Sequence, residues 1–291
     1  MKCAIIVNAY SAMQSAMNQP LRLAAELKKL GVQAQIIKND RFLCCVDGGR
    51  LINRLEGYDF CIYLDKDKYV SAMLEKSGLR LFNSHEAIRI CDDKFDTFIR
   101  LSENGINMPL TLPGLLCYSS DEKIKEDTVD IIERETGYPV VVKHCYGSLG
   151  EGVFLCRNRG ELTKKMQEVK MLPHLFQKFI SSSSGTDIRV IVIGGRVVAA
   201  MKRESKTDFR SNIELGGKGE SFVLPDDFRL ISENAARIIG LDYCGIDLLI
   251  GQNGEPVLCE VNSNAFFGGI EKVTGINVAA QYAEYISGCF V

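Results

Sequence analysis

The stretch 245–266, GIDLLIGQNGEPVLCEVNSNAF, holds two apolar runs separated by a turn signal. Asn253-Gly254 between apolar runs is the strongest short-range signal for a β-hairpin. Each run nevertheless carries a carboxylate toward its outer end, Asp247 in the first and Glu260 in the second. The register of the hairpin decides whether these two carboxylates meet.

A four-residue loop, 252–255, predicts that Leu249 faces Leu258 and that Asp247 faces Glu260. A loop with an odd number of residues would move this register by one. Directly opposed residues share a face, with Cβ atoms about 4.5–5.5 Å apart. The two carboxylates are therefore expected to lie side by side.

Opposed carboxylates destabilise a sheet unless a cation lies between them. Asn262 lies two residues beyond Glu260 and points to the same face. Magnesium is held by one or two carboxylates together with substrate phosphates. We therefore expect Asp247, Glu260 and Asn262 to bind a metal ion, the alternative being that one carboxylate is exposed at a strand end.

The chain has 291 residues, of which 46% are hydrophobic, and a net charge of −2. These values are typical of a soluble globular protein with two or three packed units, and they give no basic footprint for nucleic acid. No apolar run approaches the roughly 20 residues that span a bilayer. Eleven cysteines without a C-x-x-C pair indicate buried thiols in a reducing compartment. We expect a cytoplasmic protein without nucleic-acid or membrane partners.

The pattern of apolar residues divides the chain into three regions. Residues 1–90 alternate strands and helices, which predicts an α/β unit with a parallel sheet. LINRLEGY at 51–58 is interpreted as one of its helices. Residues 91–175 contain two helices followed by two strands. Residues 176–291 contain two long strands, a helix, the hairpin described above and a last helix.

A glycine-rich segment, VVVKHCYGSLGEGVFLC, occupies 140–156. A strand ends in Lys143, and Gly147, Gly150 and Gly152 precede the next strand. Glycines allow backbone N–H groups to curl around phosphate oxygens, and a lysine adds a positive charge. The segment is not a Walker A loop. The alternative is an ordinary glycine-rich hairpin.

A third segment, TDIRVIVIGGRVVAAMKRESKTDFRSN at 186–212, is rich in basic and polar side chains: Arg189, Lys202, Arg203, Arg210 and Asn212. Arginines near phosphate and magnesium could stabilise the charge that develops during phosphoryl and acyl transfer. The alternative is a solvated strand pair, with Arg189 on its outer face.

Taken in order, these segments resemble the ATP-grasp ligases, and among them the RimK-type amino-acid ligases. The motifs are PVVVK…GSLGEGV, QKFI, DIRVIVIGGRVVAAMKR, DFRSN, GIDLLI and EVNSN…GGIEKVTGINVA, and they cover the chain from about Cys91 to its end. The resemblance implies an ATP-grasp fold, of mixed α/β and α+β class. Its parts would be a pre-ATP-grasp α/β domain (1–90), a central subdomain with the glycine-rich loop (91–175) and a C-terminal subdomain with the metal site (176–291).

Matched motif by motif, the resemblance implies a role for each of a set of side chains. Those expected to bind the nucleotide are Lys94, Lys143, Gly147, Ser148, Gly150, Gly152, Gln177, Lys178, Phe179, Ile180, Asp187 and Lys202. Those expected near the transferred phosphate are Arg203, Arg210 and Asn212, and those expected to bind metal are Asp247, Glu260 and Asn262.

The reaction that the resemblance implies has two steps. A substrate carboxylate attacks the γ-phosphate of ATP to give an acylphosphate and ADP, and an amine then displaces phosphate to leave an amide. ATP and two magnesium ions are implied, with manganese as an alternative metal. The implied partners are an amino acid and a carboxylate acceptor, such as a peptide or protein C-terminus. A homo-oligomer remains open.

Three departures from the RimK pattern bear on specificity. Lys178 stands where the hinge usually carries an acidic residue. Glu214 stands at a position where glutamate-adding enzymes tend to have a basic residue, and SNAFFGG at 263–269 replaces the usual Ser-Pro-Gly. We expect Glu214 to disfavour an acidic amino acid, with Phe266 and Phe267 as the next candidates. The reaction class is predicted, but glutamate is not.

Two other functions stay open. One is a D-alanine–D-alanine-type ligase on the same scaffold, which would act on free amino acids without a peptide acceptor. The other is a non-catalytic nucleotide-binding module, against which the complete set of Lys143, Asp247, Glu260 and Asn262 argues.

Overall fold

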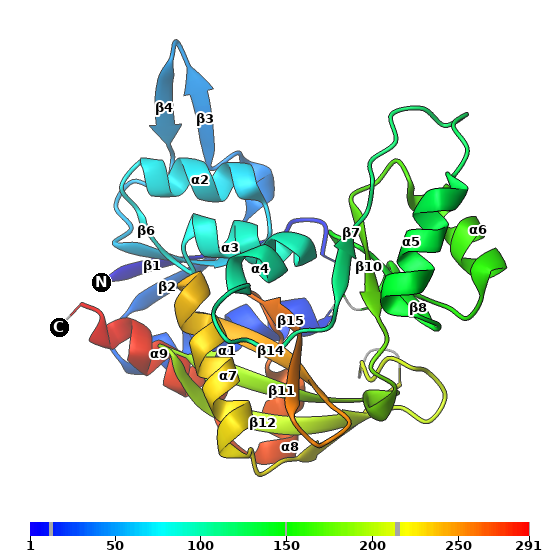
Figure 1. Cartoon of the computed structure of the whole chain (residues 1–291). Coiled ribbons are helices and arrows are strands. Elements are labelled where there is room, and N and C mark those ends of the chain that lie inside the picture. The colour runs from blue at the N-terminus through cyan, green and yellow to red at the C-terminus, as the bar shows by residue number, and fades with distance from the viewer. Residues whose placement is uncertain (12–13, 149, 213–215, 291) are drawn as a thin grey trace.

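The computed structural model of the chain describes residues 1–11, 14–148, 150–212 and 216–290. In these residues the strands form a parallel four-stranded sheet, an antiparallel four-stranded sheet, an antiparallel five-stranded sheet and a two-stranded ribbon (Figure 1). Two short 3₁₀ turns, η1 (Asn39–Arg41) and η2 (Ser181–Ser183), interrupt the connections. Within the described part of the chain, no helix has the length and apolar character needed to cross a membrane.

The first region forms the predicted parallel sheet. Its strands lie in the order β2 (Gln33–Lys38), β1 (Lys2–Val7), β5 (Phe60–Leu64) and β6 (Arg80–Phe82), and its helices are α1 (Gln14–Lys29) and α2 (Lys68–Lys76). The apolar β1 and β5 are buried at the centre of this sheet because helices and neighbouring strands cover both of their faces.

The helix predicted at 51–58 is wrong. Residues Arg50–Asn53 form β4, which pairs with β3 (Cys44–Asp47) in a ribbon that stands away from the body of the molecule (Figure 1). Gly48 and Gly49 join the two strands, with φ angles of 54° and 76°. A tight hairpin turn needs positive φ at both central residues, which glycine supplies. The local turn therefore overrides the helical spacing of the apolar residues.

The middle region is a sheet with the order β7 (Thr111–Pro113), β10 (His174–Lys178), β8 (Val140–His144) and β9 (Val153–Cys156). Helices α5 (Glu126–Thr136) and α6 (Arg159–Val169) bury their apolar stripes against it. Strand β10 carries Gln177 and Lys178 within this sheet, across the boundary proposed at residue 175. The three-domain division remains a proposal.

The five-stranded sheet has the order β13 (Lys218–Ser221), β12 (Arg196–Glu204), β11 (Thr186–Ile193), β14 (Tyr243–Ile250) and β15 (Pro256–Asn262). Helices α3 (His85–Asp92), α4 (Lys94–Leu101) and α7 (Asp226–Ile239) pack in the core on one face. Helices α1, α8 (Gly268–Thr274) and α9 (Val278–Gly288) pack in the core on the other. The first region and this sheet therefore share one hydrophobic core.

The hairpin of β14 and β15 pairs Asp247 with Glu260, as predicted. The inner register is not as predicted, because Leu249 pairs with Val257 and the loop spans the five residues 251–255. A bulge at Cys259 then moves the register by one residue and restores the outer pair. The two deviations cancel, so both carboxylates still share one face.

Candidate active site

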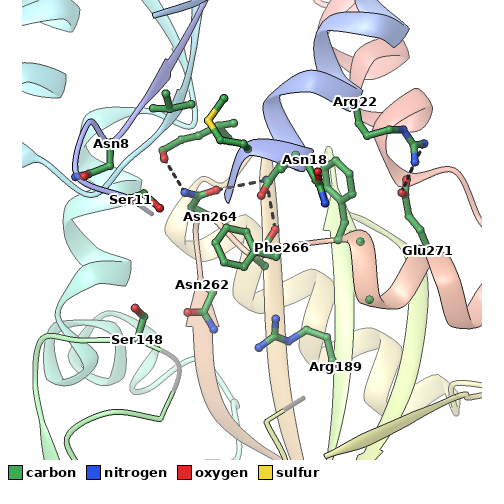
Figure 2. A pocket seen from close by; sticks show the side chains of 18 of the residues that line it. Asn8, Ser11, Asn18, Arg22, Ser148, Arg189, Asn262, Asn264, Phe266 and Glu271 are labelled. Atoms are coloured by element: carbon green, nitrogen blue, oxygen red, sulfur yellow. Dashed lines mark hydrogen bonds and ion pairs between the residues drawn. The ribbon is translucent and has the colours of Figure 1, made fainter. Parts of the chain in front are cut away.

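Two adjoining cavities define the candidate site. The larger, of about 1010 Å³, lies between α1, the carboxyl ends of β1 and β5, and the segment that joins β15 to α8 (Figure 2). The smaller, of about 110 Å³, lies between the middle sheet and the five-stranded sheet. Ser148, Asn212 and Glu260 line both cavities. These three residues mark the junction at which a group could pass from one cavity to the other.

The smaller cavity brings together most of the residues predicted to bind the nucleotide. Its lining includes Lys94, Lys143, Ser148, Gly150, Gln177, Lys178, Phe179, Ile180 and Asp187, together with Arg210, Asn212, Asp247 and Glu260. Phe209, which the sequence did not single out, also lines this cavity, and its ring meets that of Phe179 edge to face at 6.3 Å. An apolar wall of this kind suits a flat base.

The glycine-rich loop is held over the smaller cavity by two cations. Lys94 Nζ donates to the carbonyl oxygen of Gly147 at 2.8 Å, and Arg210 Nη1 donates to that of Gly150 at 2.7 Å. Lys94 also lies 3.5 Å from the Glu260 carboxylate. Lys94 therefore links the loop to one of the two carboxylates of the hairpin.

Lys202 is an exception among the predicted nucleotide ligands. It lines neither cavity and forms ion pairs with Glu204 and, at 3.9 Å, with Glu220. Its neighbour Arg203 faces the larger cavity. Successive residues of a strand point to opposite faces, so Lys202 leaves β12 on the face opposite to Arg203. The nucleotide role of Lys202 stays a prediction.

Four charged side chains form a buried row across the five-stranded sheet. Arg203 binds both oxygens of Asp187, at 2.7 and 2.5 Å, and reaches Asp247 at 3.0 Å. Arg189 forms a two-pronged contact with Asp247, with Nη2 2.8 Å from Oδ2. Burial raises the pKa of Asp247, but Arg189 and Arg203 more than offset this and hold it at about 2. Asp247 is therefore ionised at neutral pH.

Arg189 is buried, and its alternative placement on an outer face is wrong. Its side chain is only 12% exposed, and it lines the larger cavity (Figure 2). Alternation along β11 suggested an outer face, but this sheet is covered on both sides. Its Nη1 makes no hydrogen bond to any residue that the structure describes.

The three predicted metal ligands supply hard oxygen donors. Asp247 and Glu260 both line the smaller cavity, and Asn262 lines the larger one. The Asn262 amide has no hydrogen-bond partner among the described side chains and backbone groups. A cluster of three or more His, Cys, Asp or Glu is absent from the described residues, so the set depends on two carboxylates and this amide. Such donors fit magnesium.

The first region supplies one wall of the larger cavity, which the sequence analysis missed. Asn8 follows β1 and Asp65 follows β5, so the carboxyl ends of these parallel strands face the cavity. Asp65 accepts from Asn8 at 3.1 Å and from Asn39 at 2.5 Å. Arg22 of α1 pairs with Glu271 at 2.8 Å (Figure 2). The sequence could have indicated this wall, because the polar residues Asn8 and Asp65 each follow a predicted parallel strand, and the carboxyl ends of such strands meet at one edge of the sheet.

Two predicted specificity residues have different positions. Both line the larger cavity, where Phe266 is half-buried, whereas Phe267 is almost fully buried and packs in the core. Glu214 lies outside the described residues.

Known proteins resemble both the sequence and the fold. Residues 91–286 match the RimK-like ATP-grasp domain family. N-acetylaspartylglutamate synthase A from Homo sapiens is 39% identical over 224 residues, which cover 76% of this chain and 56% of that protein. A probable alpha-L-glutamate ligase from Maridesulfovibrio salexigens is 37% identical over 220 residues, which cover 75% and 70%. The chain spans a little over half the length of the first of these relatives.

Two solved structures have the same fold. A D-alanine–D-alanine ligase from Bacillus anthracis, complexed with ATP, matches with a TM-score of 0.73 and 19% identity over 99% of this chain and 95% of that one. A RimK domain protein from Sphaerobacter thermophilus matches with a TM-score of 0.73 and 17% identity over 99% and 100%. The family match and these folds lead to one conclusion: the chain belongs to the RimK-like ATP-grasp family and has the ATP-grasp fold.

Proposed function

We propose that the chain is an ATP-dependent ligase that joins a carboxylate to the amine of an amino acid. The observation that carries this proposal is the junction at Ser148, Asn212 and Glu260, which line both cavities. A nucleotide in the smaller cavity would present its terminal phosphate there. A carboxylate in the larger cavity would meet that phosphate without crossing solvent.

The residues of the smaller cavity divide into three groups. Lys94 and Lys143 place positive charge near the phosphates, while the backbone at 177–180 and the ring of Phe209 offer a site for adenine. Asp187 would contact the ribose. Asp247, Glu260 and Asn262 would hold magnesium, which neutralises phosphate charge. We propose two magnesium ions, for which manganese could substitute.

The proposed chemistry balances in two steps. A carboxylate oxygen of the acceptor attacks the γ-phosphorus, the bond to the bridging oxygen breaks, and ADP leaves. The amine nitrogen then attacks the acyl carbon. The bond from that carbon to the bridging oxygen breaks, so phosphate leaves and carries the oxygen that came from the carboxylate. Loss of a proton from nitrogen completes the amide. Arg203, Arg210 and Asn212 lie on the cavity walls where charge develops in both steps.

The substrates belong to the same proposal. Relatives are named as synthases of N-acetylaspartylglutamate and of beta-citrylglutamate, and as a probable glutamate ligase. A solved ATP-grasp ligase, PsnB, is complexed with a precursor peptide. For this chain we propose an amino acid and a carboxylate acceptor, with a peptide C-terminus as one candidate acceptor.

Two alternative functions are less well supported. A dipeptide ligase of the D-alanine–D-alanine type finds support only in the shared fold, at 19% identity. A non-catalytic nucleotide-binding module would not need the larger cavity or the three residues that line both cavities. The family match favours the RimK-type reaction.

The direct experiment measures ADP release with pools of carboxylates and amino acids, followed by mass spectrometry of the products. We expect release that requires both a carboxylate and an amine, together with magnesium. Release with free amino acids alone would favour the dipeptide ligase. Binding of ATP without release in any combination would favour a non-catalytic module.

Gly152→Ala tests the conformation of the glycine-rich loop. Gly152 has a φ of 72°, and an added Cβ would lie 2.6 Å from His144 Nδ1, so the loop would have to move. We expect the KM for ATP to rise about ten-fold or more, because small displacements in a binding site are costly. The measurement is ADP release as a function of ATP concentration.

Gly160→Ala is the matched control, because its added Cβ meets Asn158 Oδ1 at 3.4 Å and its backbone is helical. Equal KM values for the two variants would show that the loop does not shape the nucleotide site.

A further inference from the structure

Phe266 presents an apolar ring to the larger cavity. Along 263–267 the burial alternates: Ser263, Ala265 and Phe267 are buried, whereas Asn264 and Phe266 are half-buried. All of these except Ser263 line the cavity. The Phe267 ring is 1% exposed and packs against Tyr243, with the ring centroids 6.5 Å apart. Both phenylalanines line the cavity, but only Phe266 keeps a substantial exposed surface there.

The segment that carries Phe266 is fixed from both sides. Tyr243 Oη donates to the carbonyl oxygen of Ala265 at 2.7 Å, and Asn83 Nδ2 donates to that of Ser263 at 2.9 Å. The Asn264 side chain donates to the carbonyl oxygen of Leu64, in the first region, at 2.8 Å. On the other side of Phe266, the N–H of Glu271 donates to the carbonyl oxygen of Phe267 at 2.9 Å. The backbone on either side of Phe266 is therefore anchored.

The surroundings of the ring indicate which ligand group it fits. Figure 2 shows Asn18, Asn262, Asn264 and Arg189 around Phe266. A cationic group would be attracted by the ring but repelled by the Arg189 guanidinium on the same wall. A carboxylate stacked on the ring would meet its negative face, and only a carboxylate placed beside the ring would gain from Arg189. A neutral apolar group meets neither penalty and shields the ring from water.

The size of the effect follows from burial. Covering the exposed part of the ring with apolar atoms removes apolar surface from water, and an aromatic partner adds a ring-to-ring contact. Because part of the ring is already buried, we expect an effect of about ten-fold in affinity. A preference of this size separates leucine or phenylalanine from glutamate in a competition.

We propose that Phe266 selects a substrate with a neutral, apolar side chain, and that the chain does not use glutamate as its preferred amino acid. This inference rests on the proposed function, because Phe266 can select a substrate only if the chain catalyses the proposed reaction. The apolar side chain could belong to the amino acid or to the carboxylate acceptor, and in both cases the ring would pack against it.

A binding experiment tests the inference without catalysis. The sequence contains no tryptophan, so Phe266→Trp places a single tryptophan in the cavity and keeps an aromatic wall. Its fluorescence is followed during titration with leucine, leucinamide and N-acetyl-leucine, and with the three corresponding glutamate compounds. Each titration is run with and without magnesium and a non-hydrolysable ATP analogue. Leucinamide lacks the carboxylate and N-acetyl-leucine lacks the amine, so the two separate the amino acid from the acceptor.

We expect a saturable change with a leucine compound at a concentration about ten-fold lower than with its glutamate counterpart. Equal or tighter binding of the glutamate compounds would overturn the proposal, as would the absence of a change with every compound.

A kinetic experiment gives a second readout. In Phe266→Ala, we expect the KM for the apolar substrate to rise about ten-fold while kcat stays within about two-fold, because the lost contact stabilises the bound substrate and the transition state equally. Tyr69→Ala, at a 70% exposed aromatic on α2, is the control and should change neither constant. An unchanged ranking of substrates would contradict the role of Phe266. Absence of ADP release with every pair would instead count against the proposed function, and the fluorescence titration would still decide the inference.

Discussion

Glu260→Gln is expected to lower the rate of ADP formation by about 1,000-fold or more, because a bound metal supplies several kcal/mol of charge stabilisation. Glu260 is paired with Asp247 across the hairpin and lies at the junction of the two cavities. The amide has nearly the same shape but no charge to hold magnesium. The measurement is ADP release over a range of magnesium concentrations.

The same substitution should leave the fold intact. Asp247 and Glu260 repel each other without a metal, but Arg189 and Arg203 already neutralise Asp247. The substitution also removes the 3.5 Å ion pair between Glu260 and Lys94, which offsets part of the relieved repulsion. We therefore expect thermal unfolding to change little or to shift slightly upward without magnesium. Glu255→Gln, in the loop of the same hairpin, is the control and should keep full activity. Near-normal turnover of Glu260→Gln at moderate magnesium would show that Glu260 is not a metal ligand.

Arg203→Gln is expected to lower the free energy of unfolding by about 3–5 kcal/mol, the usual effect of removing one partner from a buried ion pair. Arg203 and Asp187 are 3% and 8% exposed, and Arg203 binds both oxygens of that carboxylate. Without Arg203, Asp187 has lost its cation, whereas Asp247 keeps Arg189. Denaturant unfolding measures the loss.

Arg203→Gln should lower activity as well as stability, but a second substitution should restore only the stability. Arg203 lines the larger cavity, so its loss should lower kcat by about 100-fold or more. The double variant with Asp187→Asn should regain part of the stability, because no unpaired charge is left, and none of the activity. Arg196→Gln, at the exposed start of the same strand, is the control. A loss below about 1 kcal/mol would contradict the importance of the buried pair.

The hairpin shows how far the sequence reasoning reaches. The pair of Asp247 and Glu260 was predicted from Asn253-Gly254, and the structure has this pair. The loop is longer than predicted, and the bulge that corrects it could not be foreseen. The N–H of Leu258, beside the bulge, donates to the carbonyl oxygen of Asn107 at 2.8 Å, and that partner is distant in sequence. Local turn signals do not contain such a contact.

The substrate cavity was the part least accessible from sequence. The motifs identified the nucleotide side because Lys143, the glycines and the hairpin carboxylates each have a characteristic spacing. Asn8, Asn18 and Phe266 have no such spacing. They meet only because α1 packs against the helices that follow β15, in a core shared by the first region and the five-stranded sheet. Tertiary packing, rather than any local motif, assembles that wall.

In the proposed reaction, a carboxylate attacks the γ-phosphate before the amine reacts. The most direct measurement uses an acceptor whose carboxylate carries oxygen-18, together with its amine partner and unlabelled ATP, and determines the isotope content of the phosphate released. If an acylphosphate forms at the junction of the two cavities, one labelled oxygen passes from the carboxylate to each phosphate. Release of unlabelled phosphate alongside formation of the amide would contradict this account.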